Sequence, residues 1–450
     1  MRIAFVSANR ETLPDAVIPL GLLYVMASTP AEHEQRLWDL CFDDDPLERL
    51  SRELQEFSPD IVAISLRNLQ RADYAPLEDP LSYYRALVRC VRTHSEARIV
   101  VGGGGFSIMP REMMHHLGAD FGISGEGENA FGELLKALRA GAHDFSSIGN
   151  LHYFRHRELV SVPAGKRFVE LDRLPPPDCS LVDPRYYREF GIDSIQSKRG
   201  CHFQCDYCTY PLIEGRSIRR RDPTRFVDEI FERRRVQPKA DHVFIVDGVF
   251  NFPPQHAKAI CREMIRRGFD LPWTCYTNPL GFDRELAELM VEAGCAGIEV
   301  GSDSGVDAVL DRLKKGFHVD QIQALHEHAS RAGLPDCHSF ILGTAGETLD
   351  DVRHSLEFCV ELNPFAAILG VWSDYREVFD PNLTSQRASF REGMGELLVK
   401  KAGEFLRLVI PTLGINFDSR LFRLLRRSGL RGPLWQHLDR VSPRRIASGC

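Results

Sequence analysis

The sequence predicts an α/β protein with two parallel-sheet domains followed by a small, mostly helical C-terminal segment. Three observations support this fold class. Short apolar stretches alternate with amphipathic stretches over residues 3–138 and again over 193–371, which is typical of parallel sheets covered by helices on both faces. Three consecutive prolines at 175–177 separate the two series, because proline continues neither a helix nor a central strand. A chain of 450 residues is also too long for one compact core.

The composition is that of an ordinary globular protein, with 43% hydrophobic and 26% charged residues. The net charge of −7 gives no electrostatic reason to expect a nucleic-acid partner, and we interpret the basic run 216–221 as a solvated face or an anion contact. No stretch of 18 apolar residues or signal peptide is found, so we expect no membrane span and a cytoplasmic location. Twelve cysteines, three of them clustered, favour a reducing compartment with a metal site over a disulfide framework.

Residues 1–150 are predicted to form a doubly wound, Rossmann-like domain. Its strands are expected at 3–6, 35–40, 61–65, 99–101 and 121–124, and its helices at 20–27, 46–57, 80–93, 110–117 and 129–138. Such a sheet binds its ligand at the carboxyl ends of the strands, where the glycines at 102–105 would let the backbone approach a bulky ligand. This run is not the G-x-G-x-x-G dinucleotide motif, because we predict no helix opening on its second glycine.

Residues 151–192 are interpreted as a connector with β-like pieces at 151–154 and 159–162. Residues 193–372 are predicted to form a partial, open (β/α)6 TIM-type barrel. Its strands are expected at 193–198, 242–246, 273–276, 297–300, 339–342 and 366–371, and its helices at 223–235, 254–267, 284–293, 306–313, 321–332 and 349–362. Barrel chemistry lies at the carboxyl ends of the strands.

The C-terminal segment, 373–450, breaks this repeat and is expected to form a cap that determines substrate selectivity. A helix is predicted over 391–409, because Met394, Leu397, Leu398 and Phe405 are apolar at helical spacing. Trp435 adds an aromatic side chain further on.

The loop after the first barrel strand carries Cys201, Cys205 and Cys208 at a C-x3-C-x2-C spacing. Three thiolates can hold a 4Fe–4S cluster by three irons and leave the fourth iron open to a small molecule. A zinc knuckle is an alternative, but His202 is the only close fourth ligand and would crowd the metal. Structural thiols without a metal are a second alternative.

With the aromatic Tyr207 before its third cysteine, this loop resembles the signature of radical S-adenosylmethionine (SAM) enzymes, whose open iron binds SAM. The resemblance extends over about 193–372. It implies that Asp247 accepts the amino group of SAM and that Glu299 and Ser302 meet its ribose hydroxyls or carboxylate. Each of these residues could instead belong to an ordinary loop or helix cap. The cofactor-binding residues implied in this domain are Tyr207, Asp247, Gly248, Asn278, Glu299, Ser302 and Gly343.

Residues 1–140 resemble a cobalamin-binding domain. The D-x-H-x-x-G motif, whose histidine ligates cobalt in many such domains, does not occur in this chain. We therefore hypothesise that cobalamin binds without a histidine on cobalt and that Arg67 lies beneath the corrin; alternatively, Arg67 pairs with a nearby carboxylate. The resemblance implies that cobalamin contacts come from Leu20, Ser65, Arg67, Asn68, Gly102, Gly103, Gly104, Phe106, Ser107, Gly125 and Glu126.

The combination looks most like the cobalamin-dependent radical SAM enzymes, and among them the methyltransferases. This resemblance implies three cofactors, namely a 4Fe–4S cluster, SAM and cobalamin. It also implies transfer of a methyl group from SAM via methylcobalamin to a poorly activated carbon of a small molecule, such as a secondary metabolite. An external flavodoxin- or ferredoxin-type electron donor is expected, and a monomer is compatible with the sequence. The alternatives are polar methylation of an sp2 carbon, cyclisation or rearrangement without methyl transfer, and a corrinoid or redox sensor without turnover.

Overall fold

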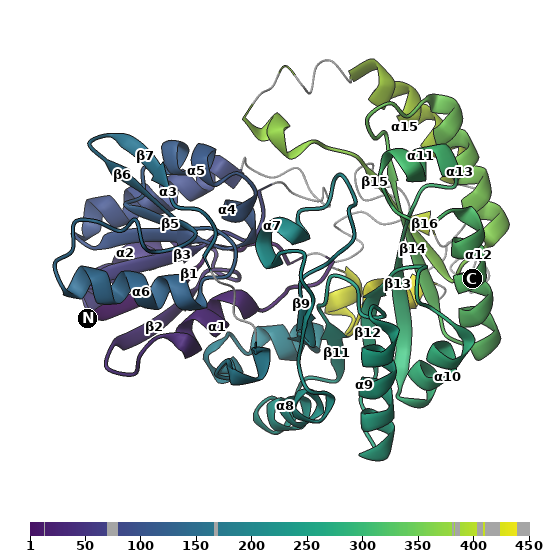
Figure 1. The fold of residues 1–450 in the computed structure, drawn as a ribbon, viewed down its shortest axis with the longest axis horizontal. Helices are drawn as coiled ribbons and strands as arrows, with labels where there is room; N and C mark the ends of the chain where they lie inside the picture. The colour runs from purple at the N-terminus through teal and green to yellow at the C-terminus, as the bar shows by residue number, and fades with distance from the viewer. Residues whose placement is uncertain are drawn as a thin grey trace.

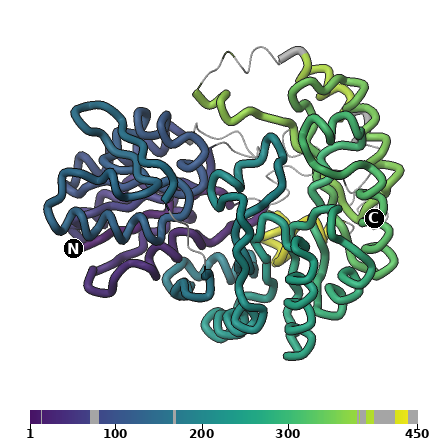
Figure 2. Tube along the Cα trace, viewed as in Figure 1, coloured from purple at the N-terminus to yellow at the C-terminus, as the bar shows by residue number. Residues whose placement is uncertain are grey.

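The computed structural model describes residues 1–12, 14–69, 80–165, 170–379, 382, 388–402, 408–409 and 424–438. Figure 1 shows two α/β units side by side, the N-terminal one in purple and blue and the second in teal and green. The trace in Figure 2 follows the chain from the first unit into the second. Among the described residues, no helix is long and apolar enough to cross a membrane.

The N-terminal sheet has seven strands in the order β2-β1-β3-β4-β5-β6-β7, of which the first five are parallel. The last two strands pair antiparallel at one edge. They are the β-like pieces that sequence analysis placed in the connector, and their hydrogen bonds make them part of this sheet. The strands are β1 (Arg2–Ser7), β2 (Glu34–Asp39), β3 (Ile61–Ser65), β4 (Arg98–Gly102), β5 (Phe121–Ile123), β6 (Leu151–Arg155) and β7 (Glu158–Ser161).

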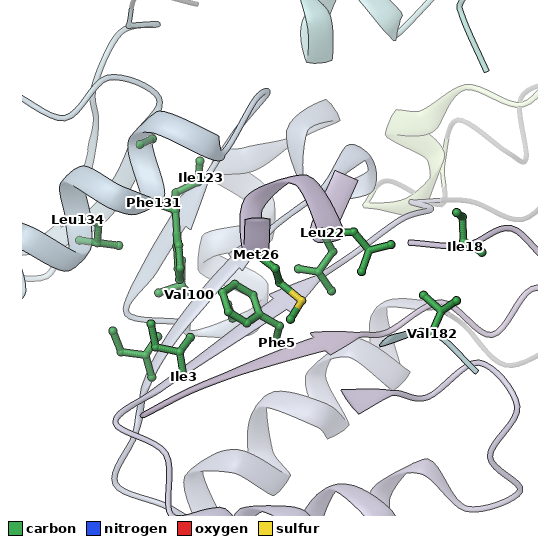
Figure 3. Packing of buried hydrophobic residues seen from close by; sticks show 14 of the residues in the cluster. Ile3, Phe5, Ile18, Leu22, Met26, Val100, Ile123, Phe131, Leu134 and Val182 are labelled. Carbon is green, nitrogen blue, oxygen red and sulfur yellow. The ribbon is translucent and has the colours of Figure 1, made fainter. Parts of the chain in front are cut away.

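Helices cover both faces of this sheet, as the continuous apolar strands predicted. Figure 3 shows one of the two cores, in which Phe5 of β1 lies close to Met26 and Val100. Phe5 also contacts Phe131, with ring centroids 5.4 Å apart. The helices are α1 (Leu20–Ser28), α2 (Pro46–Phe57), α3 (Pro80–His94), α4 (Gly104–Ile108), α5 (Pro110–Leu117) and α6 (Glu128–Arg139).

The glycine run leads into a short helix that was not predicted from the sequence. Helix α4 begins at Gly104, and the second glycine of the run, Gly103, is its N-cap. The helix has only five residues, too few for a recognisable apolar repeat, so no periodic signal could have revealed it.

The second sheet contains seven parallel strands in the order β8-β11-β12-β13-β14-β15-β16. Its helices lie on the outer face, so it forms the predicted open, partial barrel. The strands are β8 (Ile192–Ile195), β11 (His242–Ile245), β12 (Trp273–Thr277), β13 (Cys295–Asp303), β14 (Asp336–Leu342), β15 (Ala366–Val371) and β16 (Leu408–Val409). The outer helices are α8 (Pro223–Val236), α9 (Pro254–Arg266), α10 (Arg284–Glu292), α11 (Asp307–Arg312), α12 (Val319–Ala332) and α13 (Leu349–Leu362).

Short elements connect the two sheets and frame the cysteine loop. The predicted strand 193–198 is divided, because β9 leaves the barrel and pairs antiparallel with β10. The bounds are η1 (Leu171–Arg173), η2 (Cys179–Leu181), η3 (Tyr186–Phe190), β9 (Lys198–Arg199), α7 (Tyr210–Glu214), β10 (Arg219–Arg220) and η4 (Tyr375–Val378).

The C-terminal segment differs from the single long helix predicted over 391–409. Helix α15 (Ala388–Ala402) buries Met394 and Leu398 against the barrel, as its apolar spacing predicted. Instead of continuing the helix, Leu408 and Val409 form β16 on the open edge of β15, where unpaired backbone groups attract another strand. The short helix η6 (Leu434–His437) then packs against the barrel. The predicted contribution of Phe405 lies outside the described residues.

Candidate active site between the two sheets

A cavity of about 420 Å³ lies where the carboxyl ends of both sheets meet. The strand order of the N-terminal sheet changes direction between β1 and β3, and such a switch point is the usual ligand site of a doubly wound fold. Most of the residues predicted to contact cobalamin line this cavity. They are Leu20, Ser65, Arg67, Gly102, Gly103, Gly104, Gly125 and Glu126.

The other three predicted cobalamin residues do not line the cavity. Phe106 is fully buried in the core. Ser107 Oγ donates to the Gly103 carbonyl at 2.7 Å and accepts from the Gly125 amide at 2.8 Å, so it ties two cavity loops together. The Asn68 carbonyl accepts a hydrogen bond from the Tyr84 hydroxyl. These three residues therefore do not contact the cavity, and their packing and hydrogen bonds stabilise the loops that line it.

Gly103 is the residue that lets two of the cavity loops meet. Its φ is +92°, and a Cβ there would lie 2.7 Å from the Leu66 carbonyl oxygen. The Gly105 amide donates to that same carbonyl at 2.9 Å. Because only glycine combines a positive φ with this close approach, the loops after β3 and β4 join into one continuous surface.

The barrel supplies the opposite wall of the cavity. Its contributors come from β8, β11 and β12, from the residues that directly follow β8 and β11, and from α7. These residues are Ser194, Gln196, Phe244, Val246, Tyr276, Tyr210, Ile213 and Glu214. The cavity is thus shared by the two units, and a ligand held by one sheet would face the other.

Buried ion pairs join the two units beside this cavity. Arg219 Nη1 lies 2.8 Å from Glu126 Oε2, and Arg199 Nη1 lies 2.7 Å from Glu128 Oε1. The Glu126 carboxylate is therefore paired with Arg219 at the junction of the two units, although Glu126 also lines the cavity. The interpretation of 216–221 as a solvated face was wrong for Arg219, which is buried, and for Arg221, which pairs with Glu229 at 2.6 Å.

The cysteine loop is held by its own backbone and by its neighbours. The Cys201 amide donates to the Gly215 carbonyl at 3.0 Å, and the Cys208 amide donates to the Cys205 carbonyl at 3.2 Å. All three cysteines are partly buried. Burial raises the pKa of the Cys208 thiol to about 11, so iron would have to displace its proton, as bound metals do with thiols.

The arrangement fits a cluster better than a single zinc ion. Among the described residues, three metal-ligand atoms gather within 4.8 Å of one another only at His326, Asp336 and His338. The three cysteine sulfurs are therefore spread more widely than the ligands of one ion. His202 also stacks on Phe252, with ring centroids 4.4 Å apart. The loop provides three sulfur donors for a cluster and no compact tetrahedral site.

Three of the predicted SAM contacts are occupied by other protein groups. The fully buried Asp247 carboxylate accepts hydrogen bonds from the backbone amides of Ser197 and Lys198, at 2.8 and 3.2 Å. Ser302 is also fully buried, and its hydroxyl lies 2.7 Å from His338 Nδ1. The Asn278 side chain accepts from the Leu280 amide. In this structure these side chains fix the strand ends that surround the loop.

Tyr207 ties the cysteine loop to the end of β13. Its hydroxyl donates to Asp303 Oδ2 at 2.5 Å, and Lys315 forms a buried ion pair with the same carboxylate oxygen. The Tyr207 ring also packs against Trp372 at 5.9 Å. The sequence motif identified the tyrosine but carried no signal for Asp303 or Lys315.

The remaining predicted SAM residues lie at different heights in the barrel. Gly343 follows β14 with a φ of +81°, and its amide donates to Glu347. A Cβ on Gly248 would lie 3.2 Å from the Tyr210 ring. Glu299 is in the middle of β13, where Oε1 accepts a 3.1 Å hydrogen bond from Trp435 Nε1. The sequence placed this tryptophan in the C-terminal cap but gave no signal for its contact with Glu299.

Comparisons with known proteins agree with this geometry. Residues 6–135 match the B12 binding domain and residues 195–359 match the Radical SAM superfamily. The tryptophan 2-C-methyltransferase of Streptomyces laurentii is 27% identical over 80% of this chain and 70% of its own length. The cytidylyl-2-hydroxyethylphosphonate methyltransferase of Streptomyces wedmorensis is 24% identical over 88% and 87%, respectively.

A solved structure with the same fold is the radical SAM methyltransferase TsrM from Kitasatospora setae, with cobalamin and a 4Fe–4S cluster bound. It is 23% identical, covers 97% of both chains and has a TM-score of 0.80. TsrM has also been solved with its tryptophan substrate and the SAM analogue aza-SAM.

The two sheets and the cavity between them define a radical SAM enzyme that carries a B12-binding domain. With both domains present, the chain belongs to the cobalamin-dependent radical SAM enzymes, and the relatives that it matches over most of its length are named as methyltransferases. Its cofactors are a 4Fe–4S cluster, SAM and cobalamin.

Proposed function

We propose that this enzyme transfers a methyl group from SAM, carried by cobalamin, to a carbon atom of a small molecule. The observation that carries this proposal is the shared cavity, which brings the glycine-lined edge of the N-terminal sheet and the inner wall of the barrel to one space. A methyl carrier held by the first sheet and an acceptor held by the barrel would face each other there. The protein's contribution is placement of these groups and exclusion of water.

Two routes for the transfer are open to this site. In the radical route, the cluster held by Cys201, Cys205 and Cys208 would take one electron from a flavodoxin- or ferredoxin-type donor and supply the reductive cleavage of SAM. A poorly activated carbon would then lose a hydrogen atom to the deoxyadenosyl group and gain the methyl group carried by cobalamin. In the polar route, an electron-rich sp2 carbon would attack the methyl group carried by cobalamin, the electron pair of the broken bond would remain with the carrier, and the carbon would then lose its proton. The similarity to a tryptophan 2-C-methyltransferase supports the polar route as a second candidate, because carbon 2 of the tryptophan ring is such a carbon.

The test uses anaerobically purified protein with reconstituted cluster and added cobalamin. SAM with a deuterated methyl group is supplied together with tryptophan and related heteroaromatic acceptors, and the label is followed by mass spectrometry. Label on an acceptor carbon supports the proposal. Formation of 5′-deoxyadenosine in step with product indicates the radical route, and product without it indicates the polar route. Protein that carries cluster and cobalamin but never moves the label to cobalt or to an acceptor would contradict the proposal.

Arg67 has a specific place in this proposal. It is exposed in the cavity next to Ser65, and none of the described residues that line the cavity is a histidine. We therefore propose that Arg67 lies beneath the corrin, where a cation cannot ligate cobalt and discourages a water ligand. Electron paramagnetic resonance of the cobalt(II) form tests this, and nitrogen superhyperfine splitting from a protein histidine would refute it.

A further inference from the structure

Glu299 faces the inside of the barrel, close to the shared cavity. Its neighbours Ile298 and Val300 pack on the opposite side of β13, against the helix-side core. Successive side chains of a strand point to opposite faces, so Glu299 points inward. In the parallel pairing of β12 and β13, its register partner is Tyr276, which lines the cavity. Glu299 is therefore one strand away from the cavity, on the same inner wall.

The C-terminal segment builds a fixed support for this carboxylate. Trp435 Nε1 donates to Glu299 Oε1 at 3.1 Å, and Gln436 Nε2 donates to the Ala296 carbonyl at 3.0 Å. A Cβ on Gly297 would lie only 2.5 Å from the Trp435 ring, so glycine at this position makes room for the indole. In Figures 1 and 2 this yellow segment lies beside the barrel strands. The support therefore joins residues 136 positions apart in the chain.

The charge of Glu299 has no cationic partner among the described residues, whose ion pairs do not include it. Burial raises the pKa of its carboxyl to about 7, against which the Trp435 hydrogen bond acts in the lowering direction. Its side chain is nevertheless not completely enclosed. A buried carboxylate without a counter-charge is costly, and a ligand that donates hydrogen bonds would supply the missing partner.

We propose that Glu299 is a substrate-recognition residue, whose second oxygen accepts a hydrogen bond from an N–H donor on the methyl acceptor. Trp435 acts as its positioning residue. The acceptor class that fits is an amine or a nitrogen heterocycle that enters the barrel donor-first, since a carboxylate repels anionic groups. This inference rests on the proposed function, because it assigns the barrel interior to the acceptor.

This role differs from the SAM contact predicted from the sequence. SAM contacts in such barrels are expected at the carboxyl ends of strands, and β13 ends at Asp303, four residues beyond Glu299. The Trp435 hydrogen bond also fixes one oxygen of the Glu299 carboxylate on the C-terminal segment.

The test measures binding to the holoenzyme by anaerobic equilibrium dialysis with four related probes. Tryptophan has both an ammonium group and a ring N–H, benzothienylalanine has only the ammonium group, indole-3-propionate has only the ring N–H, and benzothienylpropionate has neither. We expect the probe with neither donor to bind at least tenfold more weakly than the best of the others. Glu299→Gln should abolish most of this preference, and Trp435→Phe should reduce it. Glu292→Gln, on the exposed end of α10, is the matched control and should preserve it.

Several outcomes would overturn the proposal: equal binding of all four probes, no binding of any donor-bearing probe, or an unchanged preference in Glu299→Gln. Iron and cobalt contents show whether each variant has folded, and Trp435→Phe tests the same contact without altering the carboxylate. The failure of this inference is distinguishable from the failure of the proposed function by one further measurement. If SAM still methylates the bound corrinoid while the probes show no donor preference, the function stands and the role of Glu299 does not.

Discussion

The two sheet edges that face the cavity present their residues in different ways. At the N-terminal sheet, Gly102 and Gly104 leave the strand ends open and line the cavity. At the barrel, Asp247 and Ser302 are fully buried and hydrogen-bonded to neighbouring protein groups. A glycine run after a strand therefore indicated open space. A polar residue at the same place indicates a ligand site only where no neighbouring strand satisfies its hydrogen bonds.

The largest expected effect comes from a substitution that removes the cluster at the barrel edge and leaves cofactor binding at the N-terminal sheet unchanged. Cys205→Ala removes one of three sulfur donors, so it should abolish the cluster absorbance and methyl transfer while cobalamin binding persists on the other sheet. Iron content, absorbance spectrum and cobalt content measure these outcomes. Cys90→Ala on α3, far along the chain from the loop, is the control and should keep all three. Retained iron and activity in Cys205→Ala would contradict the assignment.

Asp247→Asn tests whether the barrel edge is structural. The substitution keeps the shape of the side chain but removes the charge that pairs with buried Lys198, 3.5 Å away. Leaving a buried cation unpaired costs on the order of 3–5 kcal/mol, so we expect a lower melting temperature and poor iron loading. Asp270→Asn, an exposed partner of Arg234, should change neither. A stable, fully loaded Asp247→Asn protein with weakened SAM binding would instead restore the direct SAM contact predicted from the sequence.

Glu299 allows a pH test that needs no substrate. Its pKa of about 7 lies above the value near 4.5 of an exposed glutamate, so the folded protein holds a proton that the unfolded chain releases between those pH values. Stability should therefore fall as pH rises from about 4.5 to 7. Glu299→Gln should remove this loss. Between pH 5 and pH 8, the free energy of unfolding of the variant should therefore rise by about 1–3 kcal/mol relative to that of the parent protein.

Thermal unfolding of both proteins across this pH range measures the effect. The flanking strands carry further titratable side chains, namely Cys275 and Tyr276 on β12 and Asp336, Cys337 and His338 on β14, and all of them are unchanged in the comparison. Parallel pH profiles for the two proteins would show that Glu299 is ionised throughout, and its proposed environment would then be incorrect.

The parts of this site that could be predicted from the sequence are those encoded locally. The spacing of Cys201, Cys205 and Cys208 lies within one loop, and the glycines after β4 lie within one turn. Contacts between distant segments left no such signal. Arg219 meets Glu126 across 93 positions and Trp435 meets Glu299 across 136, and neither pair shares a period or motif. Sequence patterns thus identified the cofactors, whereas the junction of the units and the barrel interior required the fold.

The smallest expected effect concerns the open edge itself, where Gly104 offers a cleaner test than Gly103. A Cβ on Gly104 would meet its nearest neighbours at 3.4 Å, and its φ is not in the left-handed region, so a larger side chain is compatible with the backbone. Gly104→Leu should therefore fill the cavity without breaking the loop, and we expect about a tenfold loss of cobalamin affinity, or about 1.4 kcal/mol. Gly132→Leu on α6, where a Cβ meets nothing within 4 Å, is the control. Unchanged cobalamin affinity with an intact cluster would mean that the corrin does not approach this edge, and the contrast between the two sheets would lose its functional meaning.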